Sequence, residues 1–130
     1  MFNEINRLFA TKLKKILRLE LHNEDRINLY CVGEYWAAFD KSAYMLERLV
    51  PDSDPPMVLN VKGYPFPLVM YNVYYRTIDE MCYRHTMARR NLEYIQFLTT
   101  PIDDTSYNLW YDQVLADETG EDEEDDDLLS

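Results

Sequence analysis

The stretch VGEYWAAFDKSAYMLERLV, residues 32–50, decides how the rest of the chain is interpreted. Its apolar side chains recur at spacings of three and four residues, which is the repeat of an amphipathic helix. Gly33 ends the preceding segment, and the acidic Glu34 suits a first helical turn because of the helix macrodipole. We therefore expect a helix that starts at Glu34 and buries one stripe, formed by Trp36, Phe39, Ala43, Leu46 and Val50.

The two aromatic residues at the start of this helix are expected to differ in role. Trp36 belongs to the apolar stripe, which assigns it to the core. Tyr35 precedes the stripe and is not explained by it. Tyrosine combines an apolar ring with a polar tip and is common at contact surfaces. Both residues are candidate binding residues, and Tyr35 is the one that we expect to be functional.

The remaining pattern predicts a single α/β domain. Apolar residues at helical spacing predict a helix over residues 2–18, and Asp103 or Asp104 can cap a last helix. Alternating residues predict three strands, at 26–32, 57–62 and 93–98. Residues 68–83 fit a strand or a helix, and their length favours the helix. This order predicts a small mixed sheet flanked by helices.

Charge divides the chain into two parts. The formal net charge is −11, and nine of the 24 acidic residues fall in DETGEDEEDDD, residues 117–127, so 15 remain against 13 Lys and Arg in residues 1–116. A segment so charged and so poor in apolar residues cannot offset its ordering entropy by burial. We expect a globular domain over 1–116 and a disordered acidic tail over 117–130. The tail serves solubility or, alternatively, competes with nucleic acid for a basic surface.

The cations of the body form two groups. Four lie away from the apolar stripe of the first helix and three lie in the run RHTMARR. The first group is either a solvated helix face or a strip that contacts phosphate groups. The residues are Arg7, Lys14, Lys15 and Arg18, followed by Arg84, Arg89 and Arg90.

No set of residues predicts catalysis, a metal or a cofactor. His22, His85, Cys31 and Cys82 are not paired at the short spacings of a zinc site. Cys82 and His85 could share a helix face, but nothing orients the imidazole. Three glycines are too few for a phosphate-binding loop or a dinucleotide fingerprint. We therefore expect a protein that is not an enzyme.

The sequence also predicts a cytoplasmic location. It lacks an apolar leader segment and a run of about 20 apolar residues that could cross a membrane. Cys31 and Cys82 lie among apolar residues, as buried free thiols do.

One segment resembles a known family. The run GEYWAAFDKSA, residues 33–43, is similar to the strand-to-helix segment of the N-terminal mismatch-recognition domain of the MutS family. The preceding INLYCV and the later GYPFP, residues 63–67, resemble the strand and the turn of that domain. The similarity extends over residues 20–100. It implies a mixed sheet flanked by helices, with Tyr35 at the start of a helix on an exposed edge.

The matching positions imply only part of the family's chemistry. Gly33, Phe39 and Ala43 agree, Glu34 stands for Asp and Trp36 stands for Tyr. Tyr35 falls where the family's Phe wedges beside a mispaired base. Ala37 falls where the family's Glu hydrogen-bonds that base, so the polar half of the reading pair is missing. The resemblance therefore implies stacking or wedging by Tyr35 without mismatch readout.

Two functions remain. The first is a non-catalytic module that acts through a protein partner, or as a homodimer, because 11 tyrosines offer anchors for an interface. The alternative is a nucleic-acid-binding accessory protein that uses Tyr35 and the cations. The net charge of −11 opposes this alternative, since duplex binding depends on phosphate neutralisation.

Overall fold

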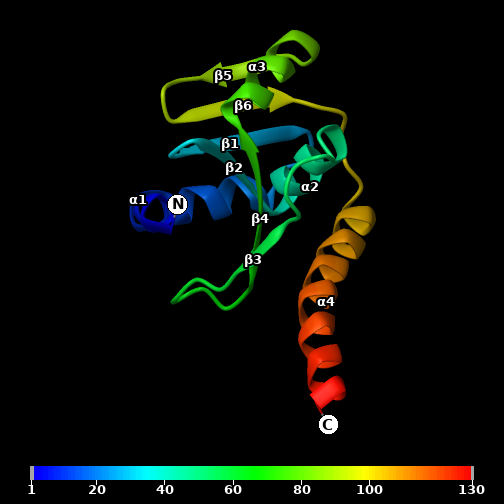
Figure 1. The fold of residues 1–130 in the computed structure, drawn as a ribbon. Coiled ribbons are helices and arrows are strands. Elements are labelled where there is room, and N and C mark those ends of the chain that lie inside the picture. Colours follow the sequence, from blue (N-terminus) through cyan, green and yellow to red (C-terminus); the bar gives the residue numbers. More distant parts are fainter. Residues whose placement is uncertain (1, 130) are drawn as a thin grey trace.

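The computed structural model describes the backbone of residues 2–129 and the side chains of residues 4–118. The chain forms one α/β domain around a six-stranded sheet with the order β3-β4-β2-β1-β6-β5 (Figure 1). The elements are α1 (Phe2–Leu21), β1 (Arg26–Val32), β2 (Tyr35–Phe39), α2 (Asp40–Leu49), β3 (Met57–Leu59), β4 (Leu68–Tyr74), α3 (Tyr75–Arg84), β5 (Met87–Arg90), β6 (Tyr94–Leu98) and α4 (Asp104–Leu129).

The single α/β domain is confirmed, but the expected mixed sheet is wrong. Every neighbouring pair in the strand order is antiparallel. Short connections join β1 to β2 and β5 to β6, and such hairpins can only produce antiparallel neighbours. The two edge strands of the sheet, β3 and β5, are short.

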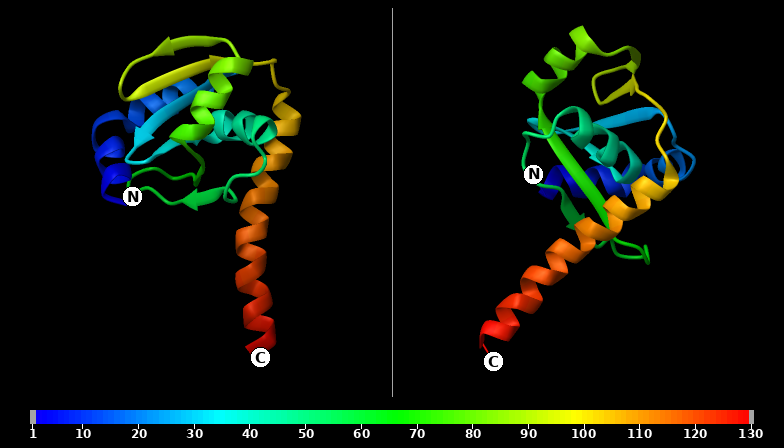
Figure 2. Two further views of the ribbon diagram at one scale, coloured as in Figure 1. Left: turned by 45° about the horizontal axis from the view of Figure 1, so that its top comes forward. Right: turned by 90° about the vertical axis from the view of Figure 1, so that its right-hand side faces the viewer.

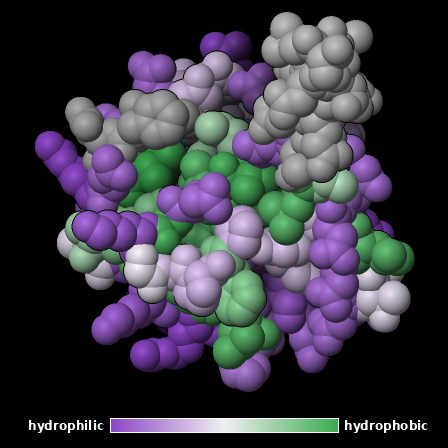
Figure 3. Space-filling model, turned by 90° about the horizontal axis from the view of Figure 1, so that it is seen from below, coloured by the Kyte–Doolittle hydropathy of each residue, from purple (hydrophilic) through white to green (hydrophobic). Residues whose placement is uncertain are grey.

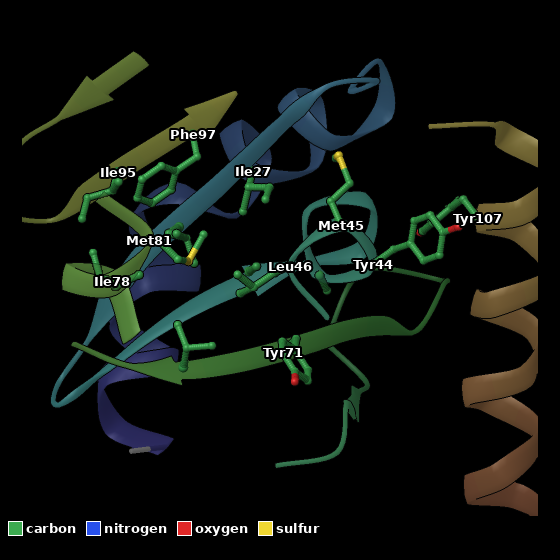
Figure 4. Packing of buried hydrophobic residues seen from close by; sticks show 14 residues of the cluster. Ile27, Tyr44, Met45, Leu46, Tyr71, Ile78, Met81, Ile95, Phe97 and Tyr107 are labelled. Atoms are coloured by element: carbon green, nitrogen blue, oxygen red, sulfur yellow. The ribbon is translucent and has the colours of Figure 1, made fainter. Parts of the chain in front are cut away.

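Helices cover both faces of the sheet. Strand β1 alternates, so that Ile27 and Leu29 pack with α2 and α3 while Tyr30 and Val32 pack with α1. Figure 4 shows the α2 and α3 face, where Ile78 and Met81 lie near residues of β6. Helix α4 starts against α2 and β3 and then leaves the domain (Figures 1 and 2).

The helix expected over residues 34–50 begins six residues later than predicted. Residues Tyr35–Phe39 form β2, which pairs with β1 on one side and with β4 on the other. Gly33 takes a φ of 65°, which permits the tight turn before β2. The apolar spacing fits a helix, but hydrogen bonds to two neighbouring strands outweigh that local preference.

Residues 68–83 contain both of the structures that their pattern fits. The favoured helix is wrong for residues 68–74, which form β4, and right for residues 75–83, which lie in α3. Strand β5 was not predicted, because its sequence MARR has little apolar signal. The start of α4 agrees with the prediction: Asp103 Oδ2 accepts hydrogen bonds from the Ser106 N–H at 3.1 Å and from its Oγ at 3.0 Å.

Three further expectations concern the two cysteines, the acidic tail and membrane-spanning helices. Cys31 and Cys82 are free, but each is half-buried rather than buried. The disorder expected for residues 117–130 stays a prediction, because most side chains of this segment lie outside the described residues. Among the described helices, none combines the length and apolar character that a bilayer crossing needs.

Candidate functional site

A groove with a volume of about 550 Å³ lies between α3 and the β5–β6 hairpin. Its base contains the buried Ile78 and Ile95 together with the half-buried Trp36. Tyr75 and Asp79 of α3 line one side, and Arg90, Asn91 and Leu92 of the hairpin line the other. We call this feature the Trp36 groove. An apolar base with a few polar groups on its rim is the usual composition of a binding groove.

Asn91 builds the hairpin side of the groove. Its Oδ1 accepts hydrogen bonds from the N–H groups of Glu93 and Tyr94, both at 2.8 Å. Its own N–H donates to the carbonyl oxygen of Tyr94 at 2.8 Å. An asparagine that bonds the backbone two and three residues ahead defines a tight turn. The turn leaves Leu92 93% exposed at the tip of the hairpin.

Helix α3 presents an aromatic ridge beside the groove. Tyr75, Asp79 and Tyr83 follow one another at four-residue intervals, which places them along one side of the helix. Tyr75 is 58% exposed and Tyr83 is 93% exposed. The buried residues of α3, Ile78 and Met81, face the core. The polar and apolar pattern of α3 thus orients two large aromatic side chains toward solvent.

Trp36 and Tyr35 lie on opposite faces of the sheet. Trp36 was predicted to be core, and it packs against the cluster formed with α2 and α3 but is only half-buried. Tyr35 points to the same face as Ala37 and Phe39, which pack with α1. Because they are consecutive strand residues, Tyr35 and Trp36 cannot contribute to one aromatic surface.

Tyr35 is paired with Tyr74. The two ring centroids are 4.6 Å apart, and the two hydroxyl oxygens are 2.9 Å apart. The hydrogen bond with Tyr74 raises the pKa of Tyr35 above the usual tyrosine value. Tyr35 therefore lies at the start of β2 and not at the start of a helix, and its ring is already in contact with that of Tyr74.

The structure separates the predicted cations. All seven are exposed. Those of α1 lie on the far side of the sheet from α3, and Arg84 lines a different pocket, of about 400 Å³, beside the loop that follows α2. Arg89 pairs in register with Gln96. Among the predicted site residues, only Trp36 and Arg90 share one groove.

A buried polar network around Glu20 was missed at the sequence level. Glu20 is 4% exposed, and its carboxylate accepts hydrogen bonds from the Ser42 N–H at 2.8 Å and from the Ser42 Oγ at 2.6 Å. The Nδ2 groups of Asn23 and Asn28 also donate to it, at 3.2 and 3.0 Å. Burial raises the pKa of Glu20 to about 7, outweighing these hydrogen bonds. The spacing of Glu20 could have indicated its burial. It follows Ile16 by four residues, which places both side chains on the buried face of α1.

This network joins three elements around a buried carboxylate. Its donors come from the turn after α1, from β1 and from α2. Ser42 is fully buried, and its Oγ both donates to Glu20 and accepts the N–H of Asn28 at 2.9 Å. Within the described part of the chain, no three His, Cys, Asp or Glu side chains are grouped as metal ligands would be.

A further apolar surface occurs elsewhere on the domain. Figure 3 shows one face on which hydrophobic residues gather in the middle, with hydrophilic residues around them. On the α1 side of the sheet, a buried cluster is formed by residues of α1, β1, β2 and β4. Four half-buried side chains pack against this cluster: Leu8 and Phe9 of α1, and Met57 and Leu59 of β3. These four side chains therefore belong to the edge of the core.

No family model matches this chain, and no curated protein or solved structure matches it either. The resemblance to the MutS recognition domain therefore depends on the sequence motif alone.

Proposed function

We propose that this chain is a non-catalytic binding module that acts through protein–protein contacts at the Trp36 groove. The observation that carries the proposal is the exposure of Leu92, at 93%, and of Tyr75, at 58%, on the rim of a groove with a tryptophan in its base. Aromatic side chains are enriched at the centres of protein interfaces, where they fill or form pockets. Exposed apolar groups next to such a groove have a natural role in contact with a partner.

The chemistry of the described residues supports a binding role. The buried Glu20 carboxylate is satisfied by hydrogen bonds from its neighbours. The groove itself offers one carboxylate and one guanidinium, from Asp79 and Arg90, and no nucleophile paired with a base. These groups can orient a partner through charge.

A site-specific cross-link tests the proposal. A benzophenone amino acid replaces Leu92 in the full chain, and the protein is irradiated in an extract of its native cell. The control carries the same group in place of Leu109, which is 67% exposed on α4. We expect a defined protein adduct from position 92 that is lost when Tyr75→Ala is added. Equal adducts from both positions, or none from position 92, would contradict the proposal.

Nucleic-acid binding is a second candidate, which the outward face of α1 favours. Arg7, Lys14 and Arg18 recur at intervals of seven and four residues, opposite the buried Ile5 and Ile16. No carboxylate lies between Glu4 and Glu20 on this helix. Cations that share one face of a helix are suited to phosphate contact. The MutS-like motif supports the same candidate.

A further inference from the structure

The Trp36 groove lies next to an exposed leucine at the tip of the hairpin that borders it. The groove is a hollow with an apolar base, formed by Trp36, Ile78 and Ile95. Immediately beside it, Leu92 projects with 93% of its surface exposed. A hollow and a projection that are adjacent on one molecule can each be satisfied by a second copy turned through a two-fold axis.

We infer that the hairpin tip of a second copy occupies the Trp36 groove, so that two chains form a symmetric dimer. This inference rests on the proposed function, because it names the partner that the groove contacts. Leu92 of each protomer lies over the base of its partner's groove. The two contacts are identical, so the interface closes on itself and adds no third chain.

The charges on the groove are arranged for the same symmetry. Asp79 lies on the α3 side and Arg90 lies on the hairpin side. Within the described residues, neither makes an ion pair with another side chain. When the hairpin of one protomer enters the groove of the other, its Arg90 approaches the α3 side, where Asp79 of the second copy lies. The two-fold axis then produces this pair twice.

The distribution of charge permits this end of the molecule to self-associate despite a net charge of −11. The segment from Arg84 to Arg90 contains three arginines and no carboxylate. Helix α4 leaves the domain on the side away from the β5–β6 hairpin (Figures 1 and 2). The repulsion between the acidic C-terminal sequences is therefore weakest for a contact through the hairpin, since screened charges interact little beyond about 10 Å.

Analytical ultracentrifugation of the full chain tests the inference. We expect a reversible monomer–dimer equilibrium at micromolar concentration. Leu92→Asp should raise the dimer Kd about tenfold or more, because it buries an unpaired charge in place of an apolar anchor. Leu109→Asp is the control for adding a carboxylate at an exposed leucine, and it should leave the Kd unchanged. Circular dichroism confirms that each variant is folded.

Charge exchange provides the second arm. Asp79→Arg and Arg90→Asp should each weaken the dimer, because two like charges then face each other in both halves of the interface. The double variant should restore association to near the level of the unmodified chain. A monomer at all concentrations, or a dimer that neither Leu92→Asp nor the single reversals weaken, would overturn the inference. If the chain is monomeric while the cross-link at position 92 captures another protein, the second copy is excluded and the proposed function survives.

Discussion

At the scale of single residues, burial decides which side chains have unusual properties. Glu20 is buried and Asp40 is half-buried, and the loss of solvation raises the pKa of Glu20 to about 7 and that of Asp40 to about 6. Asp40 also adopts a φ of 47° and accepts the N–H of Val69 at 2.9 Å, which holds the start of α2 against β4. Both groups stabilise the fold best when they carry a proton.

The first prediction concerns pH. The folded-state pKa of Glu20 is raised from 4.5, so its contribution is fully present below the unfolded pKa and is lost as pH rises through about 7. Between about pH 5 and about pH 8, the free energy of unfolding should fall by about 2–3 kcal/mol from Glu20 alone. Urea unfolding across this range measures the slope. Glu20→Gln should remove most of the slope and leave the part from Asp40, and an unchanged slope would contradict the assignment.

At the scale of elements, the β1–β2 hairpin is the feature that the local pattern misrepresents. Trp36, Phe39, Ala43 and Leu46 have helical spacing, yet the first two belong to a strand. The turn at Gly33 separates the two interpretations, because a left-handed φ is required by the hairpin and not by the start of a helix.

Gly33→Ala therefore reports on the hairpin. At φ 65° an added side chain should cost about 1–2 kcal/mol of unfolding free energy. The nearest atoms to the added Cβ would be those of Glu4 at 3.8 Å, so the cost comes from the backbone and not from a clash. Gly63→Ala, at φ 86° with nothing within 4 Å, is the matched control and should cost a similar amount in urea unfolding. A negligible cost at Gly33 alone would contradict the left-handed turn.

At the scale of the whole molecule, the sheet divides the surface into two sides. The α1 side carries the acid-free row of cations, and the α3 side carries the Trp36 groove and the tyrosine ridge. The predicted nucleic-acid surface combined Tyr35 and all seven cations. The fold places these residues on different sides, so any nucleic-acid contact must use a subset of them.

We expect such contact to depend on α1 and to appear only at low salt, because the net charge is −11. Fluorescence anisotropy of labelled duplex, mismatched duplex, single-stranded DNA and RNA measures it. Changing Arg7, Lys14 and Arg18 to Ala should lower the slope of log K against log salt by about 2–3. Lys62→Ala is the control for an exposed cation outside the row. Tyr35→Ala tests stacking, since it should weaken binding without changing the slope. Flat titrations for all four ligands would remove this candidate.

The local pattern of residues determined a large part of this protein. It predicted the first and last helices, the strands at 26–32 and 93–98 and the exposure of the cations, because amphipathic periodicity and charge act over a few neighbouring residues. For the candidate site, it identified Trp36 and Arg90 but neither Leu92 nor the α3 ridge. The sequence around Leu92 does not indicate that this leucine is exposed. Its exposure depends on the turn that Asn91 forms at the tip of the hairpin.

Only the tertiary structure decided between helix and strand for residues 35–39 and 68–74. Both segments contain aromatic and apolar residues that fit either state. They become strands because they pair with each other across a long separation in sequence, with Tyr35 opposite Tyr74. The same long-range pairing placed Tyr35 and Trp36 on opposite faces of the sheet. It also brought α3 beside the hairpin and so created the groove. Sequence periodicity reports the burial of a side chain, whereas contacts between distant segments decide which surface that side chain helps to form.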